Sequence, residues 1–79
     1  IKLSAIPNPF SSETRISCTD CVGIQRLIVL DLAGRTVHSQ LVEGTNWTLY
    51  KGTLSPGTYV VEVSSVKSGQ SARMKVTVY

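Results

Sequence analysis

The residues of this chain with the most reactive side chains are two cysteines, Cys18 and Cys21, which form a Cys-x-x-Cys pair. Such pairs serve redox exchange, zinc binding or a local disulfide. A zinc site needs about four ligands, and the single histidine, His38, lies in a run where alternation points it toward solvent. A redox pair requires a helix N-terminus that lowers the thiol pKa, and the sequence predicts no helix. We therefore expect a structural disulfide that tightens the turn before Gly23, with two free thiols as the alternative; oxidation would fit an extracytoplasmic location.

The remaining polar residues do not form a catalytic pattern. His38 has no nucleophile near it in sequence, and no glycine-rich phosphate loop is present. The carboxylates show no paired spacing; they are Glu13, Asp20, Asp31, Glu43 and Glu62. We predict that the protein is not an enzyme and uses no cofactor or metal.

The basic residues are spread singly along the chain. Eight Lys and Arg against five Asp and Glu give a formal charge of +3, but only Arg73 and Lys75 are expected on one strand face. Nucleic-acid binding favours clustered cations with aromatic residues between them, so no such partner is predicted. No segment approaches the roughly 20 apolar residues of a membrane helix, and no cleavable signal pattern opens the chain. We expect one domain over residues 1–79 without membrane insertion, carried inside a longer precursor if it is exported.

Short strand-like runs alternate with turn residues along the whole sequence. The runs are 2–5, 14–18, 25–31, 36–41, 46–50, 57–63 and 72–79. Turns spaced about every eight to twelve residues, without a helical period, are typical of antiparallel sandwiches. We predict an all-β, immunoglobulin-like antiparallel β-sandwich of about seven short strands with essentially no helix.

Two turns allow more specific predictions. Asp31 can accept a hydrogen bond from the backbone two residues on, and Gly34 can adopt a positive φ, so the flanking strands should form a short hairpin with a bulge. Pro7 and Pro9 remove two backbone donors from one short segment. That segment cannot lie inside a sheet, and we expect an extended crossing between the sheets.

The run that contains Leu27 to Leu30 is apolar on both faces. One face must fill the core, and we expect Trp47 or Tyr50 to cover the other; an exposed docking patch is the alternative. Trp47 and Tyr59 are the predicted core anchors, and each needs a hydrogen-bond partner for its polar atom when buried.

The last two runs predict a hairpin that turns around Gly69. Alternation places Val76 and Val78 toward the core and Arg73 and Lys75 on the opposite face. Chain ends normally fray, so an end that stays in a strand is expected to be anchored or bound. A terminal strand offers a receptor its backbone edge or its exposed side chains. We hypothesise that Arg73 and Lys75 make charge contacts while Val76 and Val78 keep the strand docked.

Four motifs along the chain carry a family resemblance. They are Pro-Asn-Pro-Phe at 7–10, Val-Leu-Asp-Leu-Ala-Gly-Arg-Thr-Val at 29–37, Leu-Ser-Pro-Gly-Thr-Tyr-Val-Val at 54–61 and Lys-Val-Thr-Val-Tyr at 75–79. In this order and spacing they resemble the C-terminal sorting domains of type IX secretion cargo in Bacteroidetes bacteria, over nearly the whole chain. The resemblance implies a non-catalytic signal domain, with an immunoglobulin-like sandwich, at the end of a larger secreted protein.

The resemblance also implies partners and site residues. The outer-membrane machinery of type IX secretion would recognise the domain and deliver the cargo from the periplasm to the outer-membrane surface or the extracellular space. A surface sortase would then remove the domain and attach the cargo to lipopolysaccharide. By position, the residues needed for export are Gly57, Tyr59, Lys75, Val76 and Val78, and the other motif residues are Pro7, Asn8, Pro9, Gly34 and Arg35. The cysteine pair and the aromatic Tyr79 depart from the family pattern, and the second departure leaves both sortase release and permanent attachment open.

Two other functions remain open for a small β-sandwich of this kind. A carbohydrate-binding or adhesive module would use Trp47 and Tyr50 as a stacking platform, although residues three apart do not share a strand face. A structural spacer would not need the strand at the end of the chain. Edge strands rich in Thr and Val also permit homodimers by edge pairing or strand swapping.

Overall fold

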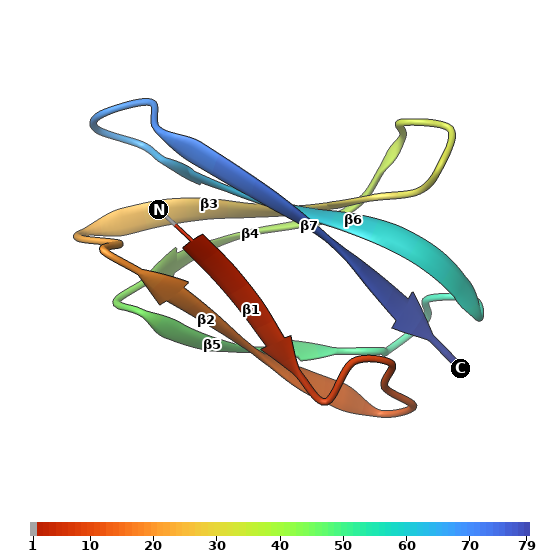
Figure 1. Ribbon diagram of the computed structural model, residues 1–79. Helices are drawn as coiled ribbons and strands as arrows, with labels where there is room; N and C mark the ends of the chain where they lie inside the picture. The colour runs from red at the N-terminus through yellow and green to blue at the C-terminus, as the bar shows by residue number, and fades with distance from the viewer. Residues whose placement is uncertain (1) are drawn as a thin grey trace.

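In the computed structural model, which describes residues 2–79, the chain forms seven β-strands, and no helix occurs among those residues (Figure 1). The strands are β1 (Lys2–Ile6), β2 (Glu13–Thr19), β3 (Ile24–Leu30), β4 (Thr36–Glu43), β5 (Asn46–Tyr50), β6 (Gly57–Ser65) and β7 (Ser71–Val78). The boundaries differ from the predicted runs by one or two residues at most.

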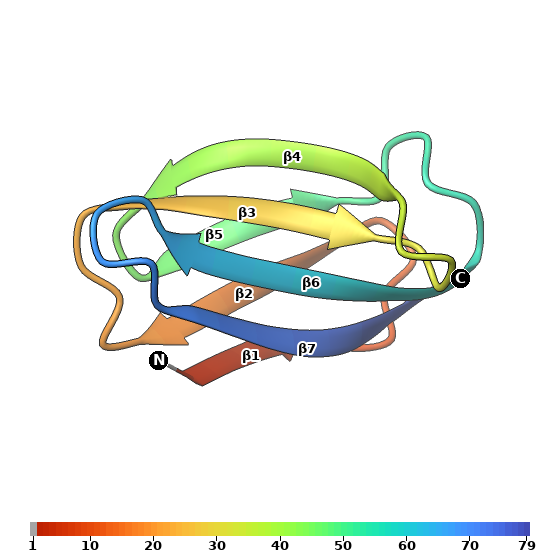
Figure 2. The same ribbon diagram turned by 90° about the horizontal axis from the view of Figure 1, so that it is seen from above.

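The strands form two antiparallel sheets that pack face to face (Figures 1 and 2). One sheet has the order β1-β2-β5 and the other has the order β4-β3-β6-β7. The prediction of an all-β antiparallel sandwich is confirmed. The arrangement follows the immunoglobulin-like Greek key, with β4 beside β3 and not beside β5. The turn at residues 31–35 is closed by backbone hydrogen bonds from Asp31 N–H to the oxygen of Arg35 and from Gly34 N–H to the oxygen of Asp31, which pair β4 with β3 as a hairpin.

Alternating side chains of the two sheets fill the space between them. Ile16 and Leu49 from one sheet, and Leu27, Val29 and Val61 from the other, are at most 2% exposed. Full burial of one such side chain contributes about 1.5–3 kcal/mol. In a chain of 79 residues, this inner layer is the main source of stability.

Trp47 and Tyr59 are core anchors, as predicted. Their exposed fractions are 7% and 8%. The indole Nε1 of Trp47 donates to the backbone oxygen of Glu43 at 3.0 Å, and the hydroxyl of Tyr59 donates to the backbone oxygen of Ser55 at 2.6 Å. Both polar atoms are therefore satisfied although the rings are buried.

The prediction that Trp47 or Tyr50 covers the outer face of β3 is wrong. Trp47 lies in the core, and Tyr50 belongs to the other sheet, where it is 65% exposed. On the outer face of β3, Ile28 is half-buried between Ser39 of β4 and Glu62 of β6, its partners in register. A central strand is shielded laterally by its neighbours, so no third layer is required.

The turn between β3 and β4 has the predicted chemistry. Asp31 Oδ1 accepts hydrogen bonds from the backbone N–H groups of Ala33 at 3.0 Å and Arg35 at 2.9 Å. Gly34 has a φ of +86°, and the register shifts at the end of β3, which is the expected bulge. The prediction that the flanking strands are neighbours is confirmed.

The prediction that the segment with Pro7 and Pro9 crosses between the sheets is wrong. It connects β1 to β2, which are neighbours in one sheet. However, Phe10 at its end forms a parallel bridge with Val78 of β7, which belongs to the other sheet. Because prolines cannot donate to a ladder, the segment leaves β1 and then runs along the edge of β7.

Candidate recognition site

The residues that sequence reasoning assigned to export come together on the β6–β7 hairpin. In register, Gly57 lies opposite Val78, and Tyr59 lies opposite Val76. Tyr59, Val76 and Val78 are buried, with exposed fractions of 8%, 1% and 2%. Gly57 has a φ of +155° and begins β6 directly after Pro56. The side chains of Tyr59, Val76 and Val78 therefore hold β7 in the sheet and present little surface of their own.

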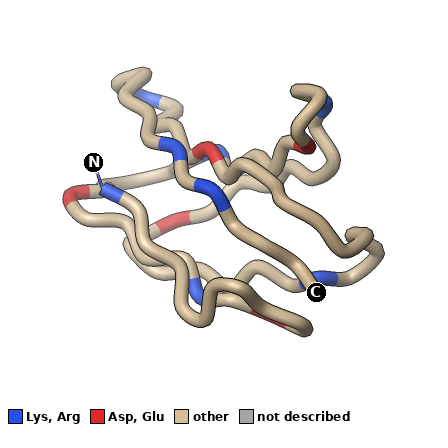
Figure 3. Tube along the Cα trace, turned by 45° about the vertical axis from the view of Figure 1, so that its right-hand side comes forward, with Lys and Arg blue, Asp and Glu red and all other residues tan. Residues whose placement is uncertain are grey.

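Arg73 and Lys75 lie on the opposite, exposed face of β7, as alternation predicts. Figure 3 shows basic positions along this strand. The guanidinium of Arg73 pairs with the carboxylate of Glu62, its neighbour in register on β6. Lys75 lies opposite Val60, and its ammonium has no ion-pair partner among residues 2–79. Of the two cations, Lys75 is thus the one that can pair with another molecule at no cost to an internal pair.

The outer edge of β7 is occupied by the segment 7–10. The side chain of Asn8 donates from Nδ2 to the backbone oxygen of Lys75 at 3.2 Å and accepts at Oδ1 from the backbone N–H of Thr77 at 3.0 Å. The backbone N–H of Phe10 donates to Thr77 at 3.0 Å, and the N–H of Tyr79 donates to Phe10 at 3.0 Å. We call this set of contacts the Asn8 clasp.

The Asn8 clasp changes what the last strand can offer a partner. The backbone edge from the oxygen of Lys75 to the N–H of Tyr79 is already hydrogen-bonded, so it is not a free edge for strand addition. The strand also ends at Val78, one residue before the expected position. Tyr79 is nevertheless held, because its backbone oxygen accepts a hydrogen bond from Lys51 Nζ.

The turn with Gly34 and Arg35 lies at the same end of the sandwich. Asp31 and Arg35 line a shallow cavity together with Ser55 and Tyr59. The Arg35 guanidinium pairs with Asp31 at 2.9 Å. The pKa of the Asp31 carboxyl is lowered, chiefly by the hydrogen bond from the Arg35 backbone N–H, with a further contribution from the Arg35 side chain. All four sequence motifs therefore meet at one end of the molecule.

The cysteine pair lies at the other end. Cys18 and Cys21 are joined in a disulfide, with their Cα atoms 5.6 Å apart, and both residues are buried. The bond closes the turn between β2 and β3. His38 is exposed on β4 and hydrogen-bonded to Gln40 at 2.6 Å. Among residues 2–79, no cluster of three His, Cys, Asp or Glu side chains could hold a metal ion.

Sequence reasoning missed two contributors to the site. Phe10 is only 2% exposed and belongs to the core, whereas the sequence identifies it only as part of a motif. The sequence indicates Lys51 only as one of the scattered basic residues, but its Nζ donates to the backbone oxygen of Tyr79. Phe10 carried a signal, since a large apolar residue directly after a proline-rich segment needs burial. Lys51 carried none, because its partner is 28 residues away.

These features define a class: a small β-sandwich whose distinctive residues gather at one end, as in a binding module. A family model described as a secretion system C-terminal sorting domain matches residues 4–78, nearly the whole chain. The chain therefore belongs to the family of type IX secretion C-terminal sorting domains. No curated protein matches the sequence.

Membership establishes the function at the level of the family. The domain is a C-terminal sorting signal for type IX secretion, recognised by that machinery and directing export toward the cell surface or the extracellular space. The family is not known for catalysis. No helix among residues 2–79 is long and apolar enough to cross a membrane.

Proposed function

We propose that the secretion machinery binds this domain on the exposed face of β7 at the end where the motifs meet, and that it binds the folded sandwich. The observation that carries the proposal is the Asn8 clasp. It joins two motifs that are 67–69 residues apart in sequence, and it does so on the strand that bears Lys75. A receptor that required a free strand edge there would have to displace these hydrogen bonds first.

The proposed roles of the site residues follow from their burial. Gly57, Tyr59, Val76 and Val78 position β7, because the three side chains face the core and Gly57 sets the start of the neighbouring strand. Lys75 is the proposed contact residue, since its ammonium is exposed and unpaired among residues 2–79. An acidic group on the receptor is the expected partner.

Arg73 has a second, supporting role in this proposal. Its pair with Glu62 keeps one positive and one negative charge in place next to Lys75. Exposed ion pairs contribute only about 0–1 kcal/mol to stability. Loss of Arg73 is therefore expected to act on recognition more than on folding, and less strongly than loss of Lys75.

A reporter fusion in a bacterium with the pathway tests the proposal. The 79-residue chain is attached to an inert periplasmic carrier, and carrier at the cell surface is quantified. Lys75→Glu is expected to reduce surface delivery severalfold, whereas Lys67→Glu, the same charge change in the β6–β7 turn at the other end, should deliver normally. Equal delivery by both variants would refute the role of Lys75, and equal loss would show a general effect of charge.

The proposal includes the wider route of the protein. Residues 1–79 form one domain at the tail of a larger precursor that passes through the periplasm to the outer-membrane surface, where a sortase removes the domain. The compact two-sheet core supports a single domain. Detection of surface-bound carrier without the domain would support removal, and a full-length fusion at the surface would establish permanent attachment.

We also propose that the isolated domain forms homodimers through β4. This edge strand has eight residues, and only its last, Glu43, is charged. Charged side chains and prolines are the usual protection against edge pairing, and β4 has little of either. Sedimentation over a range of concentrations should show a monomer–dimer equilibrium that Gln40→Lys shifts toward the monomer. A monomer at every concentration would exclude this pairing.

A further inference from the structure

A cleft lined mainly by residues with polar side chains lies at the end of the sandwich opposite the recognition site. It has a volume of about 300 Å³ and lies between the β2–β3 turn and the β6–β7 turn. Its lining residues are Asp20, Val22, Gln25, Ser65, Lys67, Ser68 and Gln70. Along β6, Gly57 and Ser65 are separated by about 26 Å at 3.3 Å per residue. The cleft can therefore be occupied without contact to the recognition site.

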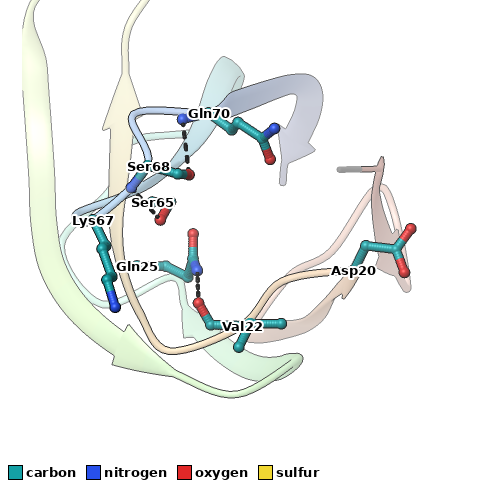
Figure 4. A pocket seen from close by; sticks show the side chains of 7 residues that line it. All are labelled: Asp20, Val22, Gln25, Ser65, Lys67, Ser68 and Gln70. Atoms are coloured by element: carbon teal, nitrogen blue, oxygen red, sulfur yellow. Dashed lines mark hydrogen bonds between the residues drawn. The ribbon is translucent and has the colours of Figure 1, made fainter.

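Gln25 is the feature of the cleft that requires an explanation. It is 1% exposed, yet it lies at the start of β3, where its neighbours Leu27 and Val29 bury apolar side chains. Its Nε2 donates to the backbone oxygen of Val22 at 2.9 Å, while its Oε1 has no hydrogen-bond partner. Figure 4 shows Oε1 pointing into the space that Ser65 and Gln70 border. A buried acceptor without a donor destabilises the folded state.

The other polar groups around the cleft indicate what kind of ligand could donate a hydrogen bond to Gln25 Oε1. The Ser65 and Ser68 hydroxyl oxygens accept backbone N–H groups within the turn, which leaves their own O–H groups to donate. The backbone of the turn bonds to itself, with Ser65 N–H to the oxygen of Gln70 at 2.7 Å and Gly69 N–H to the oxygen of Ser65 at 3.0 Å. Pairing with an added peptide strand is therefore disfavoured, and a ligand would be bound by side chains.

The charges of the lining residues narrow the class of ligand. One carboxylate, Asp20, and one ammonium, Lys67, give the lining no net charge. Val22 adds an apolar side chain that is 83% exposed. We propose that this cleft binds a small neutral molecule rich in hydroxyl groups, such as a polyol or one sugar unit, with an O–H donated to Gln25 Oε1. It differs from an aromatic stacking platform, because Trp47 is buried in the core.

The Cys18–Cys21 disulfide gives the cleft a defined wall. Asp20, with a φ of +64°, lies within the four-residue loop that the bond closes, and Val22 follows it directly. A short crosslinked loop has few alternative conformations. The disulfide therefore holds two lining residues in place, which gives a role to a cysteine pair that the export motifs do not use.

Titration of the 79-residue chain with D-glucose and with myo-inositol, followed by amide chemical shifts, tests the proposal. Shifts confined to Val22, Gln25 and the turn from Ser65 to Gln70 are expected, with a dissociation constant in the millimolar range. Gln25→Met, which removes both polar groups at similar size, should weaken binding at least tenfold. Ser68→Ala, at an exposed position, should weaken it severalfold even if Gln25→Met does not fold.

Ser11→Ala, an exposed serine near the other end of the sandwich, is the matched control and should bind as the parent chain does. Absence of chemical-shift changes for both compounds, at a ligand concentration about 50-fold above 1 mM, would overturn the proposal. Shifts that persist unchanged in Ser68→Ala would also overturn it, because binding would then lie elsewhere. Surface delivery of the carrier is a separate measurement, so failure here leaves the recognition site untouched.

Discussion

The Asn8 clasp offers the sharpest test of how this domain holds its last strand. Asn8→Ala removes two hydrogen bonds to β7, at 3.2 Å and 3.0 Å, and leaves the backbone bonds of Phe10 in place. A protein hydrogen bond contributes about 0.5–1.5 kcal/mol net, so two bonds near the lower end of that range contribute about 1–1.5 kcal/mol. Because Asn8 is exposed, we expect a loss of about 1–1.5 kcal/mol in the free energy of unfolding.

Urea unfolding followed by Trp47 fluorescence measures that loss, since Trp47 is the single tryptophan and is buried. With a slope of about 1 kcal/mol per molar urea for a small domain, the midpoint should fall by about 1 M. Hydrogen exchange locates the effect: the amide of Thr77 should exchange up to about tenfold faster, since about 1.4 kcal/mol corresponds to a factor of ten.

Two variants separate the contributions to the clasp. Asn8→Asp keeps an oxygen that can accept from Thr77 but removes the donor to Lys75, so protection of the Thr77 amide should largely persist. Ser11→Ala, exposed and close in sequence, should leave both measurements unchanged. Thr77 exchange that is equally slow in Asn8→Ala and the parent chain would contradict the reasoning, because the side chain would then not stabilise the edge of β7.

Three further predictions follow from the packing, the turn and the disulfide. Val76→Ala should lower the stability by about 2 kcal/mol, as two buried methyl groups are lost, and a change below 0.5 kcal/mol would indicate that β7 is loosely packed. The pKa of the Asp31 carboxyl is lowered in the folded state. The contribution of the ionised carboxylate to stability is therefore present above the unfolded pKa of about 3.9 and is lost as the pH falls through the lower folded value. The difference in unfolding midpoint between the parent and Asp31→Asn should accordingly shrink from pH 7 to pH 3. Reduction of the Cys18–Cys21 bond should cost about 2 kcal/mol in the chain-entropy estimate for a four-residue loop, and alkylation should add mass only after reductant; labelling without reductant would show free thiols.

The strands and the turn after β3 were predictable because their signals are local. Alternation in β6 and β7 placed Tyr59, Val76 and Val78 inside and Lys75 outside, and the structure has each of them there. The bonding of Asp31 to its own turn was predictable for the same reason, since donors and acceptor lie within four residues. In each case the relevant partner is a near neighbour in sequence or the solvent itself.

The path of the segment 7–10 was not predictable in this way. Prolines show that Pro7 and Pro9 cannot lie inside a ladder, but they do not show which edge the segment follows. The prediction of which side chain covers the outer face of β3 was wrong for a similar reason. Periodicity indicates that Ile28 faces outward, but it does not identify Glu62 as its neighbour. Both errors concern which strands lie side by side, a property of the whole fold.

By itself, the sequence determined the fold class, the strand faces, the chemistry of the turn at Asp31 and the resemblance to sorting domains, because all of these depend on residue order and spacing. Only the tertiary structure decided that the four motifs meet at one end of the sandwich, that Asn8 closes the edge of β7, and that Gln25 faces a cleft with an unused acceptor. These contacts join residues far apart in the chain, and they exist only because the two sheets pack together in one particular order of strands.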